Sequence, residues 1–229
     1  ALTTDGVQAL STAQLVTLAT SKIAALDTTH LNALTTTQVA ALTTAQAAAL
    51  TSTQTSVMET ADIAALSTAA VAALGTSALV AMGTDGLTAL KTSQIKALSA
   101  TQVAALSTDQ IAALSTAQVA NLSTAQVRAF TTAQVAALST DDLRALSTAQ
   151  VSALTTDEIK ALTTAQAAAL TSTQVGALTS DQVAGLETAD LVRLSTASLI
   201  ALGTAATAAL STAQIVALST GQVAALTTA

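Results

Sequence analysis

Hydrophobic and polar positions follow one another along this chain with a strict period of eight residues. A large apolar residue closes each octad from Leu2 to Leu226, and it is Leu at every step except Met58, Met82 and Phe130. We number the positions p1 to p8 with this residue at p8. Position p1 is then mostly Ser or Thr, p2 mostly Thr, p4 commonly Gln, p5 mostly Val, Ile or Leu, and p7 mostly Ala. Neither a helix nor a strand has a period of eight, so each octad must contain a change of backbone direction.

One short helix per octad is the structure that this pattern predicts. A continuous helix turns about 100° per residue, so the Leu positions would drift about 80° per octad and form no fixed face. In a strand, p5 and p8 would point to opposite faces. Thr at p2 is a suitable N-cap, and Ser or Thr at p1 with Gln at p4 also spells a capping box. In either register the helix begins between p1 and p3 and runs to about p8.

The placement of charge supports the same reading. All acidic residues lie at p1, p3 or p4, and the basic residues lie mostly at p6 or p7, with Lys22 and Lys91 as exceptions. Acids at the start of a helix and bases near its end are what the helix dipole favours. So short a helix is unstable alone because nucleation is costly. It is expected to bury p5, p7 and p8 against its neighbours. The predicted fold is therefore an all-α solenoid, stable only as an array.

A second period, of two octads, lies within the first. Between the second and twenty-fourth octads, large side chains at p6 occur only in even-numbered octads: Val16, Asn32, Val80, Lys96, Arg128, Arg144, Lys160 and Val192. Most charged residues also belong to even octads, and the phase inverts near Leu194. This alternation predicts two octads per coil, with a charged even layer in water and an uncharged odd layer as a contact surface. A coil of four octads would also preserve the alternation and is the alternative. A coil of three octads would not keep odd and even octads in separate layers.

Composition limits the function further. Residues 1–229 carry no cysteine and no change of composition that would mark a linker, so we expect a single continuous solenoid of 28 octads that is a segment of a longer array. The net charge of −6 and a pI near 4.4 disfavour binding to nucleic acid. Polar pairs interrupt every apolar run, so no membrane span is predicted.

Few residues are candidates for chemistry. His30 stands alone and cannot fill a metal coordination sphere, so a helix-start role is favoured. The acidic pairs Asp141–Asp142 and Asp157–Glu158 are two octads apart and would share a face in a two-octad coil. They could bind Ca²⁺ weakly, but a role in stabilising the helix dipole is favoured. The hydroxyls lack a His–acid pair to activate them. We predict no enzyme activity, no catalytic, metal-ligating or cofactor-binding residues, no cofactor and no small-molecule ligand.

Octads such as LTTAQAAAL (Leu162–Leu170), LSTAQVANL (Leu114–Leu122) and FTTAQVAAL (Phe130–Leu138) resemble the Thr/Ala-rich repeats of very long surface or secreted proteins of Gram-negative bacteria. The resemblance covers the whole chain and implies a structural role at the cell surface or outside the cell. We therefore expect a fibre or filament formed by self-association, lateral or end to end. A rigid stalk of a long adhesin is the alternative, and an ice-binding repeat a minor one.

Overall fold

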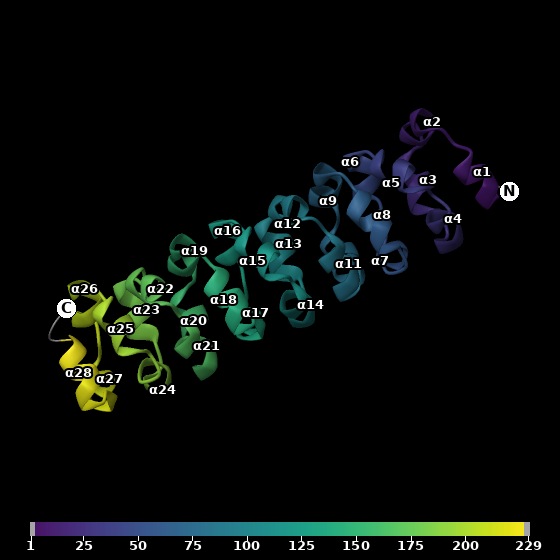
Figure 1. Cartoon of the computed structure of the whole chain (residues 1–229). Coiled ribbons are helices and arrows are strands. Elements are labelled where there is room, and N and C mark those ends of the chain that lie inside the picture. The colour runs from purple at the N-terminus through teal and green to yellow at the C-terminus, as the bar shows by residue number, and fades with distance from the viewer. Residues whose placement is uncertain (1–2, 227–229) are drawn as a thin grey trace. The chain divides into compact units, whose positions relative to one another are not determined.

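Each octad forms one short α-helix in the structure, a computed structural model that describes residues 3–226. No strand occurs among these residues, as the sequence predicts (Figure 1). The chain divides into two compact units, residues 1–121 and 122–229, and each is described by itself. The first unit holds α1 Thr4–Gln8, α2 Thr12–Val16, α3 Thr20–Ala24, α4 Thr28–Asn32, α5 Thr36–Ala40, α6 Thr44–Ala48, α7 Ser52–Thr55, α8 Thr60–Ala65, α9 Thr68–Ala73, α10 Thr76–Ala81, α11 Gly83–Ala89, α12 Thr92–Ala97, α13 Ala100–Ala105, α14 Thr108–Ala113 and α15 Thr116–Ala120. The second holds α16 Thr124–Val127, α17 Thr132–Ala137, α18 Thr140–Ala145, α19 Thr148–Ala153, α20 Thr156–Lys160, α21 Thr164–Ala169, α22 Ser172–Gly176, α23 Ser180–Gly185, α24 Thr188–Leu191, α25 Thr196–Ile200, α26 Thr204–Ala208, α27 Thr212–Ala217 and α28 Thr220–Leu226.

A capping box at p1 and p4 starts most of these helices. In α15 the Ser115 hydroxyl accepts a hydrogen bond from the Gln118 backbone N–H at 3.3 Å, and the Gln118 Oε1 accepts from the Ser115 N–H at 2.8 Å. The structure thus selects one of the two predicted registers. Position p2 is the first helical residue, as Thr132 is in α17, and its neighbour Thr131 is the N-cap. The p2 hydroxyl is therefore not the cap, because the turn begins one residue earlier.

The core of the solenoid is built from p5 and p8, as predicted. In α17 the p5 residue Val135 is fully buried and the p8 residue Leu138 is 4% exposed. The expectation for p7 was too strong, because Ala137 is only half-buried. Position p4 was missed: Gln134 is 2% exposed, more deeply buried than the Leu that closes its octad. Helices this short present so narrow a face that in most octads p4, p5 and p8 are buried and p7 is not.

Three octads, not two, make one coil. Within each unit a helix packs on the helix three places later, so the stacking repeat is three octads. In the first unit the columns are α1, α4, α7, α10, α13; α2, α5, α8, α11, α14; and α3, α6, α9, α12, α15. In the second unit they are α16, α19, α22, α25, α28; α17, α20, α23, α26; and α18, α21, α24, α27. The predictions of a two-octad coil and of a separate odd-numbered contact layer are wrong, because every column mixes odd and even octads.

The alternation between odd and even octads has a different cause in this coil. Three is odd, so successive helices of a column alternate between odd and even octads. The p6 side chain of one helix reaches the p7 carbonyl of the next helix in its column: Arg144 Nε donates to the Ala169 oxygen at 3.1 Å, and Asn32 Nδ2 to the Val57 oxygen at 3.0 Å. A large p6 side chain therefore has helices with small p6 residues above and below it. The alternation avoids crowding along each column.

Candidate functional site

The p4 glutamines form a regular polar structure along the described part of the chain. Gln166, at the start of α21, is 2% exposed. Its Oε1 accepts from the Thr163 N–H of its own octad at 2.8 Å. Its Nε2 donates to the Val135 and Leu138 carbonyl oxygens, both at 2.8 Å, at the end of α17 in the preceding coil. One side-chain amide thus joins the first turn of one helix to the last turn of another.

The same arrangement recurs along both units, and we call it the glutamine ladder. In each case the Nε2 group donates to carbonyls of the preceding coil at p5, p6 or p8, and in Gln110 also at p1 of the following octad. Its members include Gln38, Gln46, Gln54, Gln94, Gln102, Gln110, Gln118, Gln150, Gln166, Gln174, Gln182, Gln214 and Gln222. The acceptor carbonyls end the octad four places earlier, directly before the octad whose helix packs on the helix of the ladder glutamine: Gln166 of α21 reaches the end of α17, and α21 packs on α18.

Glutamine suits this position for a physical reason. The first N–H groups and the last C=O groups of every helix lack partners within the helix, and helices of five or six residues consist almost entirely of such ends. A buried polar group without a partner costs about 1–3 kcal/mol. The amide has an acceptor for the N-terminus and two donors for carbonyls, on a side chain long enough to reach the previous coil. Sequence reasoning assigned Gln to capping alone and missed the bonds between coils.

Four octads carry a buried carboxylate in place of the ladder glutamine: Asp62, Asp142, Glu158 and Asp190, all 3–6% exposed. Burial raises the pKa of Glu158, against opposing hydrogen bonds from Thr155 and the positive charge of Arg128. Burial also raises the pKa of Asp190 and of Asp62; the negative charge of Glu59 adds to the effect at Asp62. A carboxylate accepts hydrogen bonds but cannot donate to carbonyls as the amide does.

His30 is also a p4 residue and starts α4, as the sequence suggested. Asp27 is the N-cap of that helix, and its Oδ1 accepts from the His30 backbone N–H at 2.9 Å and lies 2.7 Å from Nδ1. The backbone hydrogen bond from His30, joined by the side-chain bond, lowers the pKa of Asp27. Asp27 thus caps the helix through its side chain, and the His30 imidazole hydrogen-bonds to the capping carboxylate.

The repeat that carries the ladder is a known one. A family model described as the ALTTAQ repeat matches residues 23–58, 55–92, 84–116, 111–140, 135–172, 160–188, 183–220 and 199–228. The chain belongs to the ALTTAQ repeat family. No curated protein matches the chain. The family's six letters occur as Ala161–Gln166, which runs from p7 through the core Leu and the N-cap to the ladder glutamine. The ALTTAQ motif therefore contains the core Leu at p8 and both partners of the capping box, of which the p4 glutamine is also buried.

The two acidic pairs of this ALTTAQ repeat chain do not share a face. Asp141 and Asp142 belong to α18, which packs on α21, whereas Asp157 and Glu158 belong to α20, which packs on α17 and α23. The shared face proposed for a two-octad coil is therefore wrong. Asp141 and Asp157 are not buried, while Asp142 and Glu158 are buried at p4. Among residues 3–226 no group of three or more His, Cys, Asp or Glu side chains is placed to hold a metal ion.

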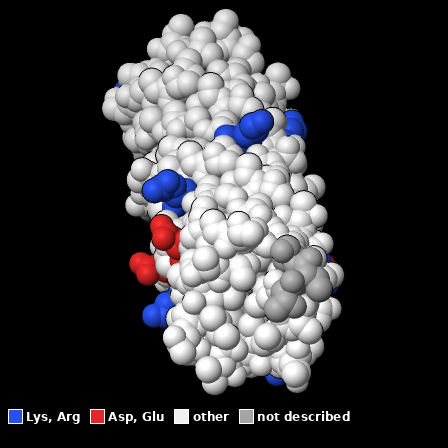
Figure 2. Space-filling model, turned by 90° about the vertical axis from the view of Figure 1, so that its left-hand side faces the viewer, with Lys and Arg blue, Asp and Glu red and all other residues white. Residues whose placement is uncertain are grey.

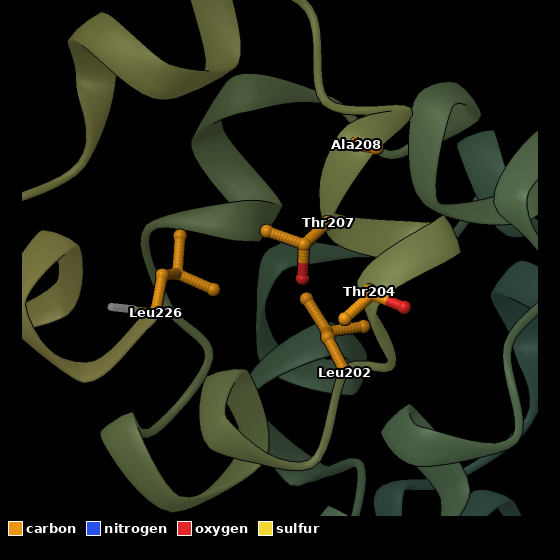
Figure 3. Close-up of a pocket in the computed structure, with 5 residues that line it drawn as sticks. All are labelled: Leu202, Thr204, Thr207, Ala208 and Leu226. Carbon is orange, nitrogen blue, oxygen red and sulfur yellow. The ribbon is translucent and has the colours of Figure 1, made fainter. Parts of the chain in front are cut away.

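A hydrophobic cavity interrupts the second unit where an ALTTAQ octad departs from the pattern. Octad 203–210 has Ala206 at p4 and Thr207 at p5 instead of Gln and an aliphatic residue. A cavity of about 250 Å³ lies there, lined by Leu202, Thr204, Thr207, Ala208 and Leu226 (Figure 3). Its lining carries no titratable group. Over the described part of the chain, no helix has the length and apolar character needed to cross a membrane.

Proposed function

We propose that the protein is a non-enzymatic structural repeat protein at the cell surface or outside the cell, where copies of the chain assemble into a fibre or filament. The glutamine ladder is the observation that carries the proposal. The glutamine that recurs at p4 of the octad is used to bind one coil to the next. A repeat that makes the same hydrogen bonds between neighbouring coils along its length is suited to a mechanical role.

The surface of the chain is consistent with assembly. Charged side chains form small separate groups on the largely uncharged surface drawn in Figure 2. Only 9% of residues are Asp, Glu, Lys or Arg. Charge repulsion between copies is therefore weak, and uncharged surface lies between the charged groups drawn in Figure 2. Uncharged surface favours close side-by-side packing, because interface centres are depleted of charged residues.

Sedimentation velocity over a concentration series, with electron microscopy of the same samples, tests this proposal. We expect concentration-dependent growth into fibres with retained helical circular dichroism. A chain that stays monomeric at the highest concentration reached contradicts the fibre proposal, and favours the adhesin stalk, which needs stiffness without self-association. Fibres that give a strand-dominated spectrum also contradict it, because such assembly would arise from misfolding.

A further inference from the structure

The three-octad coil sorts the charges of the first unit onto different columns. Glu59, Asp62, Asp85 and Asp109 belong to octads of the column α2, α5, α8, α11, α14, which we call the acidic column. No basic residue belongs to its octads. Lys22, Lys91 and Lys96 belong to octads of the column α3, α6, α9, α12, α15, which we call the lysine column. The octads of the lysine column contain no acidic residue, and they contain every Lys and Arg of the first unit.

The charges that distinguish the two columns are accessible from outside. Glu59, Asp85 and Asp109 are exposed in three successive coils of the acidic column, while Asp62 is buried at p4. All three lysines of the lysine column are exposed. Asp85 and Asp109 occupy the same octad position three octads apart, so they are one coil apart on one face. The acidic column thus carries exposed acids in three successive octads, and the lysine column carries exposed lysines in its first and fourth octads, in both cases among small, mostly uncharged side chains.

We propose that the acidic column of one copy packs against the lysine column of a second copy, and that this contact drives lateral assembly. The inference deepens the proposed function and rests on it. The partner is a second copy because the two surfaces are complementary in charge and are carried by the same chain. Like columns would set equal charges against each other, which disfavours a symmetric pairing.

The geometry of this contact explains how assembly continues. The two surfaces are different, so the contact is heterologous: each copy that joins still offers an unused acidic or lysine column to the next. A heterologous contact that does not close produces an open assembly rather than a dimer. Exposed ion pairs contribute little individually, so the charges select which columns meet, and the uncharged side chains between them supply the contact area.

Charge reversal on each column provides the test in the full chain. The acid-reversed variant carries Glu59→Lys, Asp85→Lys and Asp109→Lys. The lysine-reversed variant carries Lys22→Glu, Lys91→Glu and Lys96→Glu. We expect each variant alone to lose at least about tenfold in association constant by sedimentation velocity, because attractive pairs become repulsive. We expect an equimolar mixture to assemble again, because the reversed acidic column then meets a reversed lysine column.

A matched control distinguishes the effect of where the charges lie from the effect of a changed net charge. Asp141→Lys, Asp157→Lys and Asp181→Lys change the net charge as much as the acid-reversed variant does, at exposed p3 positions of the second unit. This control should assemble like the parent, and all variants should keep the parent's helical circular dichroism. If the parent assembles and either reversed variant assembles equally well, or the mixture does not recover, this inference is wrong and the proposed function stands. If the parent itself stays monomeric, the proposed function fails as well.

Discussion

Replacing one ladder glutamine should cost more than the loss of a helix cap. Methionine is close to glutamine in length and volume, so Gln166→Met removes the amide while leaving no large cavity. The Thr163 N–H and the Val135 and Leu138 carbonyls each lose a hydrogen bond of 2.8 Å to the amide. The Val135 carbonyl keeps its bond from the Leu138 N–H, and Thr163 is exposed. The substitution isolates the polar function of p4 from its packing.

The magnitude follows from the count of groups left without partners. An unsatisfied buried acceptor costs about 1–3 kcal/mol and a lost cap about 1 kcal/mol, so the Leu138 carbonyl and the Thr163 N–H together predict a loss of about 2–4 kcal/mol in the free energy of unfolding. Gln14 is the matched control. It lies exposed in the first coil and bonds within its own octad, where its Oε1 accepts from the Ser11 N–H at 2.9 Å. Gln14→Met should cost about 1 kcal/mol, the value of a cap.

Urea denaturation followed by circular dichroism measures the overall loss, and amide hydrogen exchange locates it. Exchange is needed because a solenoid opens locally, so a single two-state free energy can hide the effect. In Gln166→Met the amides of α17, α18 and α21 should exchange much faster than in the parent. The reasoning is refuted if Gln166→Met and Gln14→Met destabilise equally, within about 0.5 kcal/mol, because the inter-coil bonds would then contribute nothing.

The remaining predictions concern the cap, the core and a buried acid. Thr131→Ala should cost about 1 kcal/mol in denaturant melts and Thr132→Ala much less, because Thr131 is the N-cap; equal losses would contradict the register. Leu138→Ala should cost about 2–5 kcal/mol through a cavity, whereas Val16→Ala, at a side chain 39% exposed, should cost under about 1 kcal/mol. Glu158 has its pKa raised in the folded state, so its protonated form favours folding, and this stability is lost as pH rises above its ordinary value of 4.5. Glu158→Gln should therefore be more stable than the parent at pH 7 and show a smaller fall in stability between pH 4 and 7; an unchanged pH profile would count against the burial of this carboxyl.

The local structure of the octad is what the sequence predicts well. Short-range rules decide it: Ser115 and Gln118 spell a capping box three residues apart, and the apolar p5 and p8 residues lie on one side of a single turn. Each rule acts within one octad. One helix per octad, its start near p1 and the burial of p5 and p8 were therefore all predictable.

The number of octads per coil was not predictable from the same rules. The alternation of large and small p6 residues indicates only that an odd-numbered octad packs on an even-numbered one. Stacking each helix on the third helix after it meets this condition, and so does pairing successive helices. The relevant residue was the glutamine at p4, which is commoner there than Ser, Asp or Glu although these can also take part in a cap. Its second role depends on carbonyls of the preceding coil, such as those of Leu138 and Val135 for Gln166, which no local pattern reveals.

Disulfide formation between engineered cysteines tests the three-octad coil most directly, because the natural chain has no cysteine. A Cβ at Gly176 would lie 3.5 Å from the Cβ of Ala201 in the next coil, which is close to the separation in a disulfide. It would also lie 2.8 Å from the Ala201 oxygen, so a small local shift is required. Arg193 stands in the same octad position as Ala201, but only two octads after the octad of Gly176. Under oxidation, Gly176→Cys/Ala201→Cys should form an intramolecular disulfide and Gly176→Cys/Arg193→Cys should not. The opposite result would establish a two-octad coil and contradict the account.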